Sequence, residues 1–107
     1  MKIKLTSLLI AGLIGYAIGV AAAADPATNW AKNCASCHGK DGSGNTTMGK
    51  KLGVVDYRSA SVQASFSDAQ AINTIKQGAP PKMKAYGGTL SDADIKALVS
   101  YIRSFKK

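Results

Sequence analysis

The residues with the clearest chemistry in this 107-residue chain are two cysteines three positions apart, Cys34 and Cys37, and the histidine that follows them, His38. Side chains at positions i and i+3 of one helical turn point to the same side. Two thiols placed in this way can each add to one of the two vinyl groups of a haem, and His38 can then bind the iron from below the ring. The Cys-x-x-Cys-His spacing therefore predicts an attachment site for c-type haem.

Three other uses of a cysteine pair fit the sequence less well. A zinc site needs about four ligands, and the chain contains no further cysteine or histidine. A thioredoxin-type redox pair accompanies a βαβ pattern, of which the sequence shows no sign. A plain disulfide between the two cysteines is the remaining alternative to haem attachment.

An iron bound by His38 needs a sixth ligand or has an open site. His38 is the only histidine, so a second histidine in the same chain is excluded. Met83 follows Pro80-Pro81, where the proline rings force an extended, non-helical path. Met48 lies ten residues after His38, which is enough extended chain to pass the edge of a haem. The residues alone leave both methionines open as the sixth ligand.

Helical patterns dominate the rest of the chain. The segment 25–34 is expected to form a short helix, because Pro26 suits a first helical position. The segment 67–78 begins with a capping-box pattern and ends at a glycine. Ser91 opens the last helix, in which one apolar face follows the i, i+3, i+4, i+7 spacing: Ile95, Leu98, Val99 and Ile102. No strand pattern is present, so an all-α fold is expected.

Five glycines within residues 39–53 predict a loop that turns closely around a bulky cofactor. We expect one carbonyl of this loop to accept a hydrogen bond from the free ring nitrogen of His38 and so to orient the imidazole. A phosphate-binding loop is not expected, because the Gly-Lys-Ser/Thr ending is missing.

The start of the chain has the layout of a secretory signal peptide: a short basic segment, an apolar run and four alanines, Ala21–Ala24. We therefore expect residues 1–24 to be a cleaved signal and residues 25–107 to form one domain in the periplasm. The alternative is an uncleaved membrane anchor facing the periplasm, because the uncharged stretch 5–24 has about the length of a membrane span.

The chain resembles a class I c-type cytochrome, and most closely the small bacterial monohaem group that includes cytochromes c6 and c553. The stretches that carry the resemblance are residues 30–44, 48–54 and 83–105. The resemblance implies three to four helices around one covalently bound haem. It places Trp30 at the aromatic position of the first helix.

For the site, the resemblance implies thioether bonds at Cys34 and Cys37, with His38 as the proximal and Met83 as the distal ligand of one haem c. The chain departs from the family at Lys84, where the family usually has a proline directly after the ligand methionine.

The resemblance also implies a one-electron carrier between redox partners, and not an enzyme. The formal net charge of +8 favours a partner with an acidic docking surface or an anionic membrane surface, and we expect a monomer. Nucleic acid is not expected, because no arginine-rich stretch or set of stacking aromatics is present. Five lysines are candidates to surround the exposed haem edge: Lys40, Lys50, Lys51, Lys82 and Lys84.

Two alternatives stay open. One is a haem subunit fixed to a membrane redox complex by an uncleaved first helix. The other is a sensor or peroxidase with an open sixth position on the iron, although the chain offers no second histidine and no glutamate for peroxide chemistry.

Overall fold

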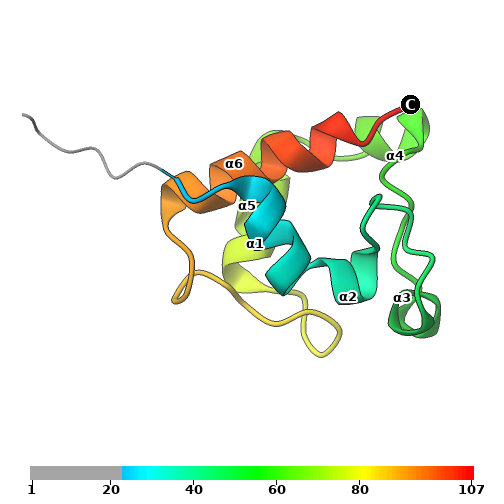
Figure 1. Cartoon of the computed structure of the whole chain (residues 1–107), viewed down its shortest axis with the longest axis horizontal. Helices are drawn as coiled ribbons and strands as arrows, with labels where there is room; N and C mark the ends of the chain where they lie inside the picture. Colours follow the sequence, from blue (N-terminus) through cyan, green and yellow to red (C-terminus); the bar gives the residue numbers. More distant parts are fainter. Residues whose placement is uncertain (1–22) are drawn as a thin grey trace, which may run out of the picture.

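The computed structural model describes residues 23–107, so the predicted signal peptide and the alternative anchor lie outside the described residues except for Ala23 and Ala24. Within the described part there are six helices (Figure 1): α1 (Pro26–Asn33), α2 (Ala35–His38), α3 (Thr47–Leu52), α4 (Ala60–Ala64), α5 (Asp68–Gln77) and α6 (Asp92–Ser104). The only β-pairing in residues 23–107 is an isolated bridge between Ala79 and Met83. The expected all-α class is confirmed.

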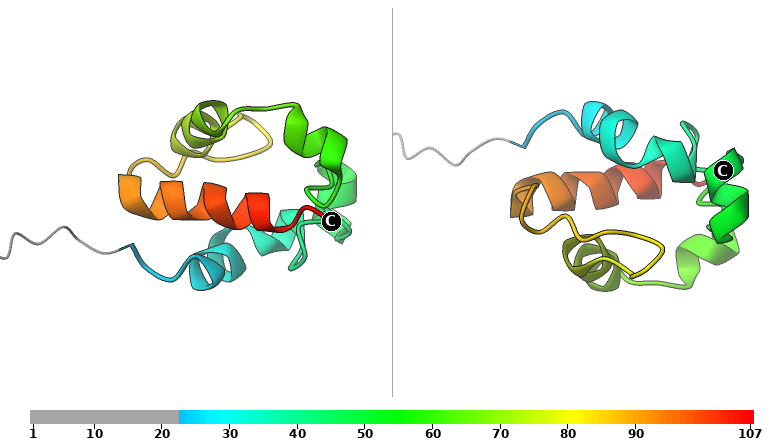
Figure 2. Two further views of the ribbon diagram at one scale, coloured as in Figure 1. Left: turned by 90° about the horizontal axis from the view of Figure 1, so that it is seen from above. Right: turned by 90° about the horizontal axis from the view of Figure 1, so that it is seen from below.

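The last helix, α6, is the element on which α1 and α5 pack. It lies between α1 on one side and α5 on the other (Figure 2) and contacts both. Its predicted apolar face is buried in full: Ile95, Leu98, Val99 and Ile102. None of the helices in residues 23–107 has the length and apolar character needed to cross a membrane.

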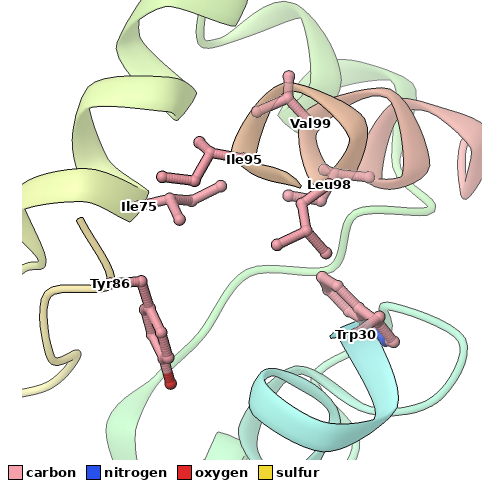
Figure 3. Close-up of a cluster of buried hydrophobic side chains, with 7 residues drawn as sticks. Trp30, Ile75, Tyr86, Ile95, Leu98 and Val99 are labelled. Carbon is pink, nitrogen blue, oxygen red and sulfur yellow. The ribbon is translucent and has the colours of Figure 1, made fainter. Parts of the chain in front are cut away.

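The core joins this face to one aromatic residue of α1 and one aliphatic residue of α5. Trp30 is 2% exposed and Leu98 is 1% exposed, and Ile75 of α5 completes the contact with Ile95 (Figure 3). Trp30, which the resemblance places at the aromatic position of the first helix, is therefore a core residue.

The helix starts follow the sequence signals. Both α5 and α6 begin with complete capping boxes, in which the serine at the N-cap and the third helical residue satisfy each other's backbone N–H groups. At the start of α1, Pro26 occupies the first helical position as expected. The carboxylate of Asp25 makes no bond to the helix backbone and accepts one from the Thr28 hydroxyl at 3.0 Å.

The expectation of a continuous loop over residues 39–53 is wrong for residues 47–52, which form α3. The hydroxyl of Thr46 accepts a hydrogen bond from the Gly49 N–H at 2.8 Å and caps the start of this helix. Gly53 ends it in the left-handed conformation, with φ of 71°. Together with α2 and α4, this short helix raises the number of helices above the three or four expected.

Candidate haem-binding site

A cavity of about 580 Å³ lies between the α1–α2 segment, residues 52–57, α5 and the loop 79–86. The core residues Ile75, Leu98 and Ile102 are part of its lining, so the wall is apolar where it meets the core. Its volume falls within the ~300–1,000 Å³ that is usual for cofactor sites.

The three motif residues line this one cavity. Cys34 stands between α1 and α2, and its carbonyl accepts the backbone N–H groups of Cys37 at 3.2 Å and His38 at 2.9 Å. This single turn brings both sulfurs to the cavity wall, as the i, i+3 spacing predicts. Both cysteines are half-buried and carry free thiols.

Burial shifts the pKa values of two motif residues, Cys34 and His38. The pKa of the Cys34 thiol is raised to about 11, first by burial and second by the negative charge that Cys37 would carry. Burial also lowers the pKa of His38 below its ordinary value. The imidazole is therefore neutral at neutral pH, which is the form that binds a metal ion.

The ring of His38 is held by aromatic packing. It stacks on Tyr57 with centroids 5.4 Å apart and planes at 27°, and the Trp30 ring lies 5.7 Å away. Its Nδ1 is buried and has no hydrogen-bond partner among residues 23–107. The expected bond from His38 to a carbonyl of the glycine-rich segment is therefore absent. The carbonyl of Gly39, in the same segment, accepts the Trp30 indole N–H and the Gly42 N–H.

Helix α3 supports the motif from the other side. The hydroxyl of Thr46, which caps α3, donates a 2.9 Å hydrogen bond to the carbonyl of Cys37. Gly49 is buried, and a Cβ at this position would collide with the carbonyls of Cys37 and Gly44. The close approach of α3 to α2 therefore depends on a glycine at position 49.

The structure separates the two candidate methionines. Met83 is half-buried and lines the cavity together with Cys34, Cys37 and His38. Met48 lies on α3, is 44% exposed and is not part of the cavity wall.

The backbone of Met83 is fixed by its bridge to Ala79. The Ala79 N–H donates to the Met83 carbonyl at 2.8 Å, and the Met83 N–H donates to the Ala79 carbonyl at 3.0 Å. The chain turns here at Gly78, whose φ of 77° favours glycine and whose Cβ would lie 2.8 Å from the Met83 carbonyl oxygen. The loop is shaped by these contacts as well as by the two prolines.

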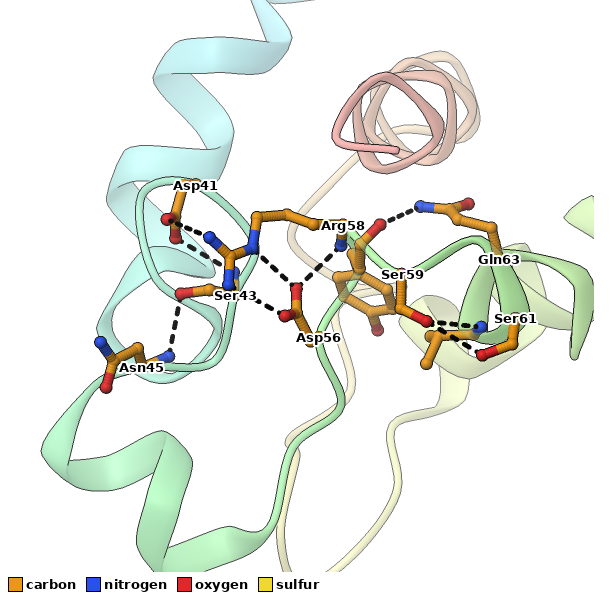
Figure 4. Close-up of polar contacts among 10 residues, drawn as sticks. Asp41, Ser43, Asn45, Asp56, Arg58, Ser59, Ser61 and Gln63 are labelled. Carbon is orange, nitrogen blue, oxygen red and sulfur yellow. Dashed lines mark hydrogen bonds and ion pairs between the residues drawn. The ribbon is translucent and has the colours of Figure 1, made fainter. Parts of the chain in front are cut away.

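A cluster of polar contacts surrounds the backbone at Tyr57 and at the residues next to it. Arg58 donates two hydrogen bonds of 3.0 Å to the carboxylate of Asp56 and lies 3.6 Å from Asp41 (Figure 4). The buried amide of Gln63 donates to the Tyr57 carbonyl at 2.7 Å and to a carbonyl of α6 at 2.9 Å. No motif marks Gln63 in the sequence, because its partners are backbone carbonyls from distant segments.

Of the five candidate lysines, Lys82 and Lys84 line the cavity. Lys50 and Lys51 are exposed on α3, which leads directly into the cavity-lining segment 52–55, and Lys40 is exposed after α2. The cavity opening therefore carries positive charge at the methionine loop, and further lysines lie near it on α3.

The residues present fit a haem. One cavity offers two thiols for the vinyl groups, a neutral imidazole and a thioether for the iron, and an apolar wall for the macrocycle.

An all-helical domain with this donor set defines a cytochrome of the c type. The chain belongs to the family described as cytochrome c oxidase, cbb3-type, subunit III, whose model matches residues 21–102. Its cofactor is haem c, for which Cys34 and Cys37 form the attachment motif.

Individual relatives agree with this assignment. The chain is 35% identical over 79 residues to cytochrome c6 of Synechococcus sp., covering 74% of this chain and 66% of that protein. The solved structure of the KustC0563 c-type cytochrome matches with a TM-score of 0.74 and 36% identity, over 78% of this chain and all of the other.

A second group of relatives is much longer. The chain is 31% identical over 84 residues to the cbb3-type cytochrome c oxidase subunit CcoP of Azospirillum brasilense, covering 78% of this chain and 28% of that protein. The chain therefore spans about a quarter of the length of the cbb3 oxidase subunits that it matches.

Proposed function

We propose that this chain is a periplasmic one-electron carrier with a single haem c held by His38 and Met83, and that it is not an enzyme. The observation that carries the proposal is the meeting of His38, Met83 and the two cysteines at one cavity. When bound, the haem supplies a one-electron redox couple. A histidine and a methionine that both stay bound favour the reduced state and leave no site for a substrate on the iron.

The protein's own residues have three tasks in this proposal. Cys34 and Cys37 attach the group, and the packing of Trp30 and Tyr57 fixes the plane of the His38 ring. The apolar wall excludes water, which also favours the less charged, reduced state.

The deciding experiment compares Met83→Ala with Met48→Ala in exported holoprotein. We expect Met83→Ala to abolish the methionine–iron absorption band of the ferric protein and to make the iron accessible to cyanide. Met48→Ala is the matched control and should leave the spectrum unchanged. A wild-type spectrum typical of a high-spin ferric haem would instead favour the sensor or peroxidase.

Partner recognition is proposed to use the lysines near the cavity opening. Lys82 and Lys84 stand at the cavity itself, and Val55 adds an apolar side chain that is 48% exposed at its edge. A small apolar contact among positive charges suits a weak, brief complex with an acidic redox protein. We propose that the carrier is a monomer in solution.

Location is proposed from the first 24 residues. Cleavage after Ala24 releases residues 25–107 into the periplasm, and the intact mass of the exported protein tests both this cleavage and the addition of one haem. A mass that includes residues 1–24 would show an uncleaved anchor.

A second candidate follows from the cbb3-type relatives. In this alternative the domain acts as a haem subunit fixed to a membrane redox complex. Co-purification of the native protein with a membrane complex, in place of recovery in the periplasmic fraction, would favour it.

A further inference from the structure

The loop that carries Met83 is anchored at its far end by Tyr86. The Tyr86 N–H donates to the Ile75 carbonyl of α5 at 2.9 Å, and the next N–H, of Gly87, donates to the Lys76 carbonyl at 3.1 Å. These carbonyls belong to the last turn of α5, where a helix leaves carbonyls without an internal partner. The backbone at Tyr86 is therefore fixed to α5.

The side chain of Tyr86 ties the same point to the haem-attachment segment. Tyr86 is 9% exposed, and its hydroxyl donates a 2.9 Å hydrogen bond to the carbonyl of Asn33. Asn33 is the last residue of α1 and directly precedes Cys34. In Figure 3 the Tyr86 hydroxyl points away from Ile75 and Ile95. Tyr86 therefore links the end of α5, through its backbone N–H, to the end of α1, through its hydroxyl. It also lines the cavity.

The hydrogen bond from Tyr86 lies in the loop where this sequence departs from the pattern of its family. The residue after Met83 is Lys84 in place of a proline, so one restraint on the loop is missing. Lys84 is exposed, and its ammonium lies 5.1 Å from the centre of the Tyr86 ring. The contacts of Tyr86 supply an anchor three residues from Met83, on the side of the loop opposite the Ala79 bridge.

We infer that Tyr86 is a positioning residue for Met83, and that its hydroxyl bond to Asn33 keeps the methionine loop closed over the cavity. The inference rests on the proposed role of Met83 as a ligand. Tyr86 is part of the cavity wall. Its hydroxyl positions Met83 through the loop backbone and not by binding the iron.

The test measures how often the loop opens. Imidazole added to the ferric holoprotein competes with Met83, so its apparent affinity rises with the fraction of molecules in which the loop is open. We expect Tyr86→Phe to bind imidazole about fivefold to tenfold more tightly than wild type, the range that the loss of one buried hydrogen bond gives. Visible spectroscopy follows the loss of the methionine–iron band.

Tyr101→Phe is the matched control, because the Tyr101 hydroxyl makes no hydrogen bond to any residue in 23–107 and its ring does not line the cavity. It should bind imidazole like wild type. Lys84→Pro in the Tyr86→Phe background should recover part of the lost restraint, because the N–H of Lys84 donates no hydrogen bond within the described residues.

The outcomes separate this inference from the function on which it rests. If Tyr86→Phe binds imidazole like wild type while Met83→Ala binds it much more tightly, the role of Tyr86 is overturned and the ligand stands. If Met83→Ala and wild type bind imidazole equally, the proposed ligand fails, and the role of Tyr86 fails with it. Lower stability to urea without a change in imidazole affinity would show a merely structural tyrosine.

Discussion

The indole Nε1 of Trp30 donates a 2.9 Å hydrogen bond to the carbonyl of Gly39, and both residues are buried. The bond spans the turn that carries Cys34, Cys37 and His38. It therefore fixes the two ends of the attachment motif relative to each other. The same indole packs on Tyr101 of α6 and on Phe105, which directly follows this helix.

Replacing Trp30 by Phe should lower the free energy of unfolding of the holoprotein by about 2–3 kcal/mol. The change removes one of the two donors to the buried Gly39 carbonyl, which keeps the Gly42 N–H, and it removes part of a buried ring system. Urea unfolding followed by circular dichroism measures the loss. Tyr101→Phe is the control, because it alters an aromatic residue that packs on Trp30 without removing a hydrogen bond within residues 23–107. A loss below about 0.5 kcal/mol for Trp30→Phe would contradict the role of the indole bond.

Gly49→Ala tests the contact between α3 and α2. An added methyl group meets the carbonyls of Cys37 and Gly44, so α3 has to move away from the motif, at a cost of about 1–3 kcal/mol. Gly88→Ala is the matched control, because a Cβ at Gly88 has no atom within 4 Å. Equal stability of the two variants would show that α3 does not depend on this close approach.

The parts of the site that could be predicted from the sequence depend on local patterns. The spacing of Cys34 and Cys37 is a property of one turn, and the apolar face of α6 repeats within one helix. The capping boxes of α5 and α6 are equally local, since each joins residues three apart.

The parts that could not be predicted depend on contacts between distant segments. Gly49 looked like one glycine of a loop, because its contact with Cys37 appears only after α3 folds back. Gln63 gave no signal, because it donates to carbonyls 6 and 39 positions away.

The ion pair of Asp56 with Arg58 should make a small, pH-dependent contribution to stability. The hydrogen bonds from Arg58 hold the pKa of Asp56 below its ordinary value of 3.8. A lowered folded-state pKa stabilises the fold above the ordinary pKa, and the contribution is lost as the pH falls through the folded value. Asp56→Asn should therefore be less stable than wild type at pH 7 and equal to it at about pH 2. A stability difference that does not change with pH would exclude the ion pair as its cause.

The positive charge at the cavity opening should control encounter with anionic reagents. Replacing Lys82 and Lys84 by Glu should slow oxidation of the ferrous protein by hexacyanoferrate(III) about tenfold or more at low ionic strength. Added salt should slow the wild-type reaction, because it screens the charges. It should therefore also reduce the difference in rate between the wild type and the variant. Lys106→Glu is the control, since Lys106 is exposed and does not line the cavity. If Lys106→Glu slows the reaction as much as one cavity lysine does, net charge and not position is responsible.

Removal of the haem should unfold most of the chain. Five of the seven buried core residues also line the cavity, namely Trp30, Ile75, Tyr86, Leu98 and Ile102, so a protein without the group would expose much of its core to water. A domain of this size has little apolar area to spare. The Cys34→Ser, Cys37→Ser double variant, which cannot form thioether bonds, should therefore show solvent-exposed fluorescence from the single tryptophan and poorly dispersed amide signals. Well-dispersed signals and cooperative unfolding of this variant, purified free of haem, would contradict the prediction and show that α1, α5 and α6 form a sufficient core by themselves.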